Sequence, residues 1–141
     1  MADGLKVSSA TGVVTAEAVG DSSNVDVTLK SKGTGSVALD DGTLTATATA
    51  GAATLSKQHG VVTSEALTTA AGSDYTLTLT NTKVSTSSIV LVSLDNGTNT
   101  TAGIYVRLVT PGSGSVVIIV RNAHASSALN GTIKIVFCVL N

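Results

Sequence analysis

The chain has 141 residues and a formal net charge of −1, and its composition is 43% hydrophobic, 12% charged and 2% aromatic. A mean hydropathy of +0.40 with so little net charge excludes disorder driven by charge repulsion. The scattered Lys and Arg residues exclude the basic patch of a nucleic-acid-binding protein, and no apolar run approaches the roughly 18 residues of a membrane span. We therefore expect a folded protein without nucleic-acid or membrane partners. The N-terminus has no basic lead-in and no apolar run, so we expect no signal peptide.

The first 59 residues alternate like strands but carry few bulky side chains. This part consists mainly of Ala, Thr, Ser, Gly and Val, whereas every aromatic residue, the only proline and the only cysteine come after it. Short candidate strands lie at residues 13–15, 25–29, 36–39 and 43–50. Because such strands cannot fill a core and would leave unpaired edges, we expect residues 1–59 to form an extended β-rich arm that pairs with other chains.

From residue 60 onward, six strand-like runs are separated by turn signals. They lie at residues 61–67, 75–80, 89–94, 103–109, 116–120 and 131–140. In the second run an apolar face alternates with a threonine face. The third run is apolar almost without interruption, which favours a strand buried on both faces. Pro111 followed by Gly112 predicts a type II turn.

These runs predict an all-β fold, since no helical periodicity separates them. We predict an antiparallel β-sandwich or jelly-roll-like domain over residues 60–141, preceded by the arm over residues 1–59. We also expect the domain to stay folded when the arm is removed.

Residues with catalytic or metal-binding chemistry are sparse. His59 lies at the predicted junction, His124 lies in a loop, and Cys138 is the only cysteine, which excludes an intrachain disulfide and reads as a small buried hydrophobe. No spacing indicates a Ser-His-Asp triad. Residues 40–42 lack the ligands of a calcium loop, and residues 32–35 lack the spacing of a phosphate-binding loop. We expect no enzymatic activity, no cofactor and no metal.

Two tyrosines could take part in binding by stacking on sugar rings. Tyr75 and Tyr105 both occupy alternating strand positions, where packing with a hydroxyl at the surface is the favoured interpretation.

Residues 24–37 read NVDVTLKSKGTGSV. This segment resembles one that recurs in bacteriophage tail fibres, tailspikes and other virion surface proteins. Residues 60–79, 120–122 and 128–135 are similar to small β domains at the ends of such fibres and in capsid decoration proteins. The resemblance implies an assembly protein, commonly trimeric, with an interwoven N-terminal arm and a globular β domain, and it transfers no catalytic residues.

The chain has about the size of a head decoration, or cement, protein. We therefore expect it to bind the major capsid protein on the outer head surface of a virion as a homotrimer, after synthesis in the host cytoplasm. The arm would bind by strand addition. The candidate contacts to other subunits or to the capsid are Val25, Val27, Leu29, Lys30, Lys32, Val37, Leu39 and Leu44.

The alternative is a binding protein, a short tail-fibre or tailspike-type tip that recognises the host. In that case the loops at residues 95–101 and 123–130 would contact a surface glycan or protein.

Overall fold

The computed structural model describes residues 4–10, 13–19 and 43–141, and the chain divides into a unit Met1–Asp40 and a unit Asp41–Asn141. In the first unit, β1 (Gly4–Ala10) and β2 (Val13–Val19) form an antiparallel pair with Gly4 opposite Val19. Strand β2 includes the strand predicted at residues 13–15. The strands predicted at 25–29 and 36–39 lie outside the described residues.

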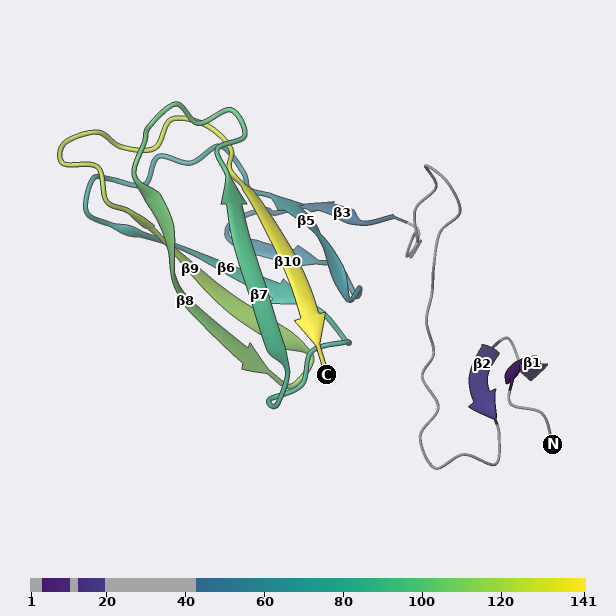
Figure 1. The fold of residues 1–141 in the computed structure, drawn as a ribbon. Coiled ribbons are helices and arrows are strands. Elements are labelled where there is room, and N and C mark those ends of the chain that lie inside the picture. The colour runs from purple at the N-terminus through teal and green to yellow at the C-terminus, as the bar shows by residue number, and fades with distance from the viewer. Residues whose placement is uncertain (1–3, 11–12, 20–42) are drawn as a thin grey trace. The chain divides into compact units, whose positions relative to one another are not determined.

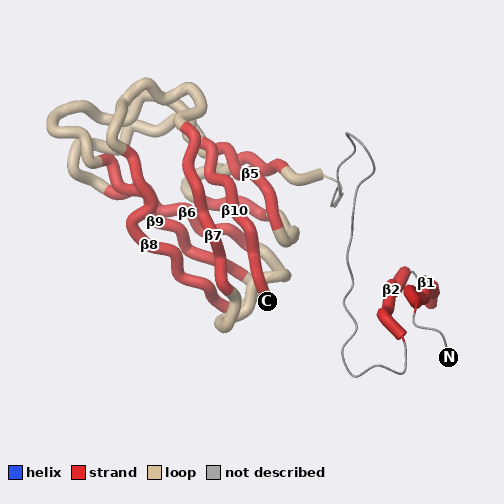
Figure 2. The backbone as a smooth tube through the Cα atoms, viewed as in Figure 1, coloured by secondary structure: helices blue, strands red, loops and turns tan. Residues whose placement is uncertain are grey.

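The second unit is a β-sandwich of two four-stranded sheets (Figures 1 and 2). The sheet that we call the β7 sheet has the order β3 (Thr45–Thr47), β5 (His59–Thr63), β10 (Lys134–Leu140), β7 (Ile89–Asp95). The β8 sheet has the order β4 (Ala52–Thr54), β6 (Asp74–Thr80), β9 (Ser115–Asn122), β8 (Ile104–Gly112). No helix occurs in the described ranges, so the predicted all-β sandwich is confirmed.

The last two strands of the chain insert between earlier ones. β10 lies between β5 and β7, and β9 lies between β6 and β8, which makes the strand order jelly-roll-like. All six strands predicted after residue 60 are present, and their pairings with one another are antiparallel. Each buried face follows from the period-2 alternation. On β6, for example, Tyr75, Leu77 and Leu79 are buried while the threonines between them are exposed.

The core fills the space between the two sheets. Its largest fully buried side chains include Phe137 and Ile135 from β10, Leu77 and Leu79 from β6, and Ile118 from β9. The core therefore consists mainly of aliphatic side chains and a single phenylalanine. It brings together strands that lie far apart in the sequence.

The predicted boundary between residues 59 and 60 falls inside β5, because the sandwich includes residues from 43 onward. β3 pairs in parallel with β5, and β4 pairs in parallel with β6, so both sheets are mixed. The turn between β3 and β4 has positive φ at Ala50 and Gly51 and is closed by hydrogen bonds between Thr49 and Ala52, as in a two-residue hairpin. This hairpin joins one edge of each sheet and buries Ala48 and Ala53.

Two further details differ from the sequence-based expectations. Pro111 and Gly112 belong to β8, opposite Val116 and Ser115, and the turn between β8 and β9 is displaced to residues 113–114. The apolar strand β7 is not buried on both faces, since it lies at the edge of its sheet and its outward side chains are exposed. The physical reason is that nothing in the described chain packs against the outer face of the β7 sheet.

Candidate protein-binding face

The outer face of the β7 sheet carries exposed apolar side chains on two neighbouring strands. Ile89 and Leu91 on β7 are 62% and 57% exposed, and Leu140 and Val136 on β10 are 48% and 39% exposed. We call these four side chains the apolar face. On both strands the alternating neighbours point inward, because residues one position apart lie on opposite sides of a sheet.

The strand register makes the apolar face continuous. Leu140 lies opposite Ile89, and Cys138 lies opposite Leu91 on one side and His59 on the other. The next row places Val136 between Val61 and Ser93. Because directly opposed residues in antiparallel strands have Cβ atoms about 5 Å apart, these side chains touch across the strands.

A shallow depression of about 310 Å³ lies in the middle of this face. His59, Leu91, Val136 and Cys138 line it. A side chain of a partner protein could fill this depression. Contiguous exposed apolar side chains of this kind are typical of an interaction site.

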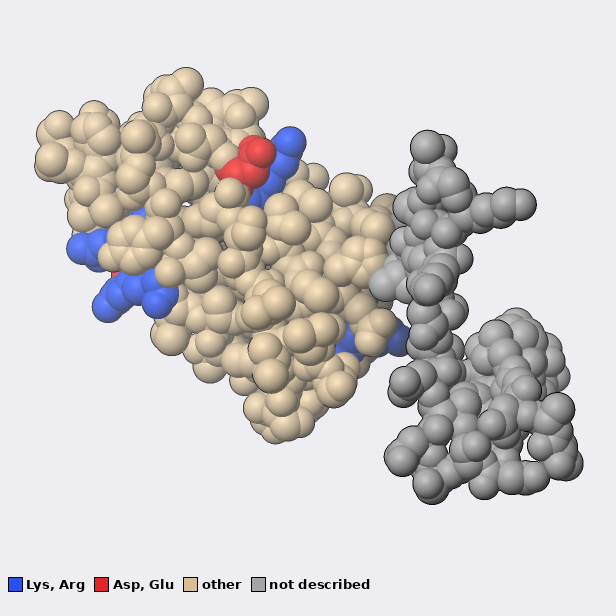
Figure 3. All heavy atoms as spheres, in the orientation of Figure 1, with Lys and Arg blue, Asp and Glu red and all other residues tan. Residues whose placement is uncertain are grey.

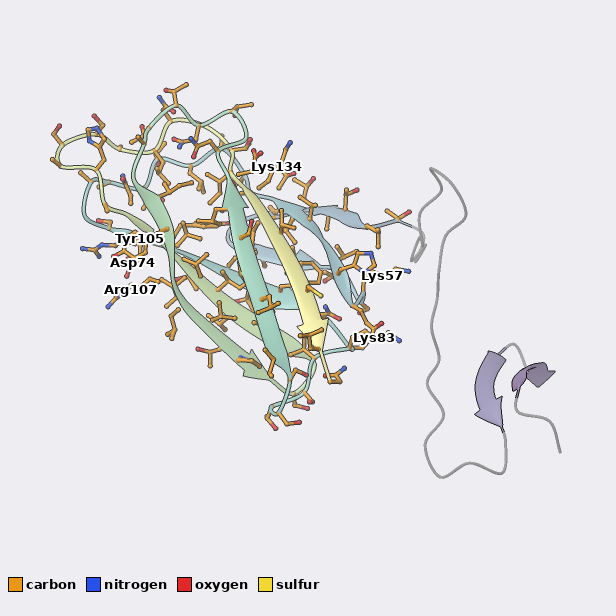
Figure 4. All side chains as sticks on the ribbon, viewed as in Figure 1. Lys57, Asp74, Lys83, Tyr105, Arg107 and Lys134 are labelled. Atoms are coloured by element: carbon orange, nitrogen blue, oxygen red, sulfur yellow. The ribbon has the colours of Figure 1, made fainter. Side chains whose placement is uncertain are left out.

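Charged groups lie at the margins of the apolar face. In Figure 3, which shows the side on which β7 and β10 lie in front, the blue and red side chains are at the rim and the middle is uncharged. Lys134, labelled in Figure 4, lies opposite Asp95 at one end of the β10–β7 pair. The face is therefore suited to an apolar partner surface rather than to an anionic one.

The outer face of the β8 sheet has a different character, with an ion-pair cluster. Asp74 Oδ1 accepts a hydrogen bond of 3.1 Å from Arg121, and Asp74 Oδ2 accepts one from Arg107. A β-bulge between Val106 and Leu108 turns both Arg107 and Leu108 outward, which brings Arg107 to Asp74 (Figure 4).

The two guanidinium groups control the ionisation of the carboxylate in this cluster. Desolvation acts to raise the pKa of Asp74, but the hydrogen bonds from Arg121 and Arg107 outweigh it, so the pKa lies below its usual value. Each carboxylate oxygen of Asp74 thus has a guanidinium partner within the cluster. Tyr105, opposite Arg121 and 49% exposed, leaves one ring at the surface beside the cluster.

The two loops predicted for host recognition lie against each other. Asn130 Oδ1 accepts the Thr100 N–H at 2.8 Å, and Asn130 Nδ2 donates to Thr100 Oγ1 at 2.7 Å. Thr101 Oγ1 donates to the Ala128 carbonyl at 2.8 Å. The pair of loops is therefore fixed by side-chain hydrogen bonds before any ligand binds.

The two histidines lie apart, and only His59 is next to the cysteine. His124 Nδ1 accepts the N–H groups of Ser126 and Ser127, which engages the ring in its own loop. Cys138 is a partly exposed free thiol on the outer face, beside His59, rather than the buried hydrophobe that was predicted. In residues 43–141 and the β1–β2 pair, no group of three or more His, Cys, Asp or Glu side chains could hold a metal ion.

Tyr75 is not available for stacking on a ligand. Its side chain is 7% exposed, and its hydroxyl donates to Glu65 Oε2 at 3.0 Å. Tyr105, in contrast, is exposed enough to contact a ligand.

Among the predicted contact residues, Leu44 alone lies in the described ranges. Its side chain is half-buried, and its carbonyl accepts the Val61 N–H at 2.8 Å within the same chain. Val25, Val27, Leu29, Lys30, Lys32, Val37 and Leu39 lie outside the described residues. Their contact with other chains stays a prediction, as does that of Leu44.

The apolar face was missed because the sequence pattern has two interpretations. A run such as residues 89–94, apolar on both faces, is typical of a strand covered on both sides. The same pattern results when one face is covered by the protein's own core and the other awaits a partner. Residues 134–140 show the same pattern, since Val136 and Leu140 are apolar at positions where a solvent-exposed face would carry polar side chains.

Comparison of the chain with protein-family models, with curated proteins and with solved structures finds no match. No helix in the described part of the chain is long and apolar enough to cross a membrane.

Proposed function

We propose that this protein is a structural component of a bacteriophage virion, a capsid decoration protein that binds the outer head surface as an oligomer and stabilises it. The apolar face carries the proposal, because a protein-binding surface of this kind fits an assembly role. The resemblance of residues 24–37 to virion surface proteins is the reason for proposing a virion as the assembly. The proposal needs no cofactor and no catalytic residue.

The mechanism is mechanical. Burial of apolar surface stabilises a contact by about 25 cal/mol per Å², so each half-exposed Leu or Ile of the apolar face contributes on the order of 1 kcal/mol when the capsid covers it. Stabilisation of the shell follows mass action, and repetition over many equivalent positions makes the total effect large. The arm residues predicted as contacts would add strand pairing to this apolar contact.

Binding to purified capsids tests the proposal directly. The double variant Ile89→Ser/Leu91→Ser removes half of the apolar face, and we expect it to lose at least ten-fold in affinity for capsids. The matched control is Leu108→Ser, which removes a side chain of similar exposure, 50%, from the outer face of the other sheet. The control is expected to bind like the unaltered protein.

Copy number in the particle provides the second test. A decoration protein is present in many copies on the head. A handful of copies located at the tail would contradict the proposal. So would equal capsid binding by the Ile89→Ser/Leu91→Ser variant and the Leu108→Ser control.

A second candidate function is host recognition at a tail tip. The observation that favours it is the pair of hydrogen-bonded loops at residues 95–101 and 123–130, since a preformed binding surface loses little conformational entropy when a ligand binds. Substitution Thr100→Ala with Asn130→Ala would weaken adsorption to host cells in this case. The same variant would leave capsid binding unchanged.

A further inference from the structure

Strand β7 has one free edge. It pairs with β10 and with no other strand in the part of the chain that the structure describes. The direction of its backbone groups follows from the ladder. The Val139 N–H donates to Gln58, toward β5, so alternate residues of β10, including Cys138 and Val136, direct their N–H and C=O groups toward β7.

The same alternation identifies the free groups on β7. Leu91 and Ser93, which lie opposite Cys138 and Val136, direct their backbone groups to β10. The N–H and C=O groups of Val90, Val92 and Leu94 therefore point away from the sheet, toward the free edge.

The two edge strands on this side of the sandwich differ in how they are protected. β8 carries three features that prevent pairing with another chain: a bulge, the charged Arg107 at that bulge, and Pro111. β7 is a regular strand of seven residues with no bulge, no proline and no Lys or Arg. Natural proteins protect their edge strands unless the edge is used for pairing, and within residues 43–141 only one of these two edges is protected.

Incomplete burial on the same side supports this conclusion. The hydrophobic side chains that pack against the core but stay partly exposed include Val90, Val92 and Leu94 of β7. The opposite side of the sandwich is closed by the β3–β4 hairpin, where Ala48 and Ala53 are buried. A strand added to β7 would cover the three half-buried β7 side chains.

We propose that β7 pairs antiparallel with β7 of a second copy of this chain, with Val92 of each copy on the two-fold axis, which gives a dimer in place of the homotrimer expected from the sequence resemblance. In this register Val92 pairs with the partner's Val92 and Val90 pairs with the partner's Leu94. All the free N–H and C=O groups of these residues are then hydrogen-bonded. The register also keeps every side chain on its own face, because the side-chain period of a strand is two.

The register suits a second copy as the occupant, because Val90, Val92 and Leu94 all lie opposite apolar residues of the partner, and charge does not oppose the pairing. Asp95 is the only charged residue of β7, and in this register it lies opposite the partner's Ile89. The two Asp95 carboxylates are then about 20 Å apart along the paired strands. That separation exceeds the Debye length of about 8 Å at physiological ionic strength, so they do not repel appreciably.

The dimer would join two β7 sheets into one continuous eight-stranded sheet. The apolar faces of both copies would then adjoin across the pair and form one larger surface. In this respect the inference rests on the proposed function, since it names the self-association through which the protein would present its binding surface.

Sedimentation or light scattering of the purified full chain, without capsids, tests the dimer. Pairing of two seven-residue strands buries less surface than a standard interface, which buries about 1,600 Å². We therefore expect a dissociation constant in the micromolar range. Val92→Pro removes the central edge N–H without removing a hydrogen bond to β10, and it should raise the dissociation constant at least ten-fold. Val92→Ala shortens the same side chain but keeps the N–H, and it should remain a dimer.

A disulfide trap tests the register without a proline. Leu91 lies opposite the partner's Ser93 as a non-hydrogen-bonded pair, with Cα atoms about 4.5 Å apart, which a disulfide can bridge. The variant Leu91→Cys/Ser93→Cys with Cys138→Ser should therefore form a covalent dimer on mild oxidation. The control Ile89→Cys/Ser93→Cys with Cys138→Ser, whose cysteines are not opposite each other, should not.

A monomeric full chain, a trimer, or equal self-association of the proline and alanine variants would overturn the β7 pairing. Because these measurements use no capsid, they are independent of capsid binding. A dimer that fails to bind capsids would contradict the proposed function and leave the pairing established.

Discussion

The hydroxyl of Tyr75 donates a hydrogen bond of 3.0 Å to Glu65 Oε2, while Glu65 Oε1 accepts the N–H of Gly51 at 2.8 Å. One carboxylate thus connects β6 to the turn between β3 and β4. Burial, together with this hydrogen bond and the negative charge of Glu65, raises the pKa of Tyr75 well above its usual value. Residues 43–54 are held to the sandwich by side-chain contacts as well as by strand pairing.

Tyr75→Phe should lower the free energy of unfolding by about 1–3 kcal/mol at neutral pH, because the charged acceptor Glu65 loses the hydrogen bond that the Tyr75 hydroxyl donates. The raised pKa of Tyr75 also predicts a pH effect. Its contribution is complete below the unfolded-state pKa of about 10 and declines as the pH rises above that value, because the unfolded state then ionises first. Denaturant unfolding at pH values on both sides of 10 measures both effects.

The control for this prediction is Tyr105→Phe, whose ring is half exposed. It should change stability by less than about 0.5 kcal/mol. If Tyr75→Phe kept the alkaline loss of stability unchanged, the assignment of that loss to Tyr75 would be wrong.

Gly60→Ala should destabilise the sandwich by about 1–3 kcal/mol, as expected for overpacking of a filled core. A methyl group at this buried position would lie 2.7 Å from Leu55 Cδ2 and 2.8 Å from the Leu44 carbonyl oxygen. Gly112→Ala is the matched control, since its nearest contact would be Ser115 Oγ at 3.4 Å. Thermal unfolding should separate the two, and equal melting temperatures would contradict the packing at Gly60.

Asn122→Ala should cost about 1–3 kcal/mol, because a fully buried side chain loses its hydrogen bonds to the carbonyls of Thr69 and Ser127. Asn122 is fully buried, and its Nδ2 donates to the carbonyls of Thr69 at 3.0 Å and Ser127 at 2.9 Å. Asn96→Ala, at an exposed turn position, is the control and should stay near the stability of the unaltered protein. Urea unfolding measures the difference.

Truncation at two positions tests where the folded unit begins. A fragment of residues 43–141 should unfold cooperatively, because it keeps both mixed sheets. A fragment of residues 60–141 loses β3, β4 and the buried Leu55, so it should be unfolded or much less stable, in contrast to the expectation from sequence. Circular dichroism with urea titration distinguishes the two, and equal stability would disprove the role of the β3–β4 hairpin.

The positions of the six strands after residue 60 could be predicted because the alternation of apolar and polar side chains is a local property. The apolar side of β6, with Leu77 and Leu79, is visible in the sequence for this reason. The two short strands β3 and β4 could not be assigned to the sandwich in the same way. Their Ala and Thr residues look too small for a core, and their burial depends on parallel pairing with β5 and β6.

The candidate site was less predictable than the fold. The loops at residues 95–101 and 123–130 can be located from the sequence as segments between strand-like runs, but their direct contact through Asn130 and Thr100 depends on the strand order. The apolar face depends on the same order, which places β7 at an edge and β10 beside it.

The sequence alone therefore determined which residues form the strands of the sandwich and which side of most strands faces the core, because side-chain direction alternates along a single strand. Only the tertiary structure decided that β7 lies at the edge of its sheet, that residues 43–54 complete both sheets, and that Ile89, Leu91, Val136 and Leu140 share one exposed surface. These relationships join residues distant in sequence, and no local pattern specifies which strands become neighbours.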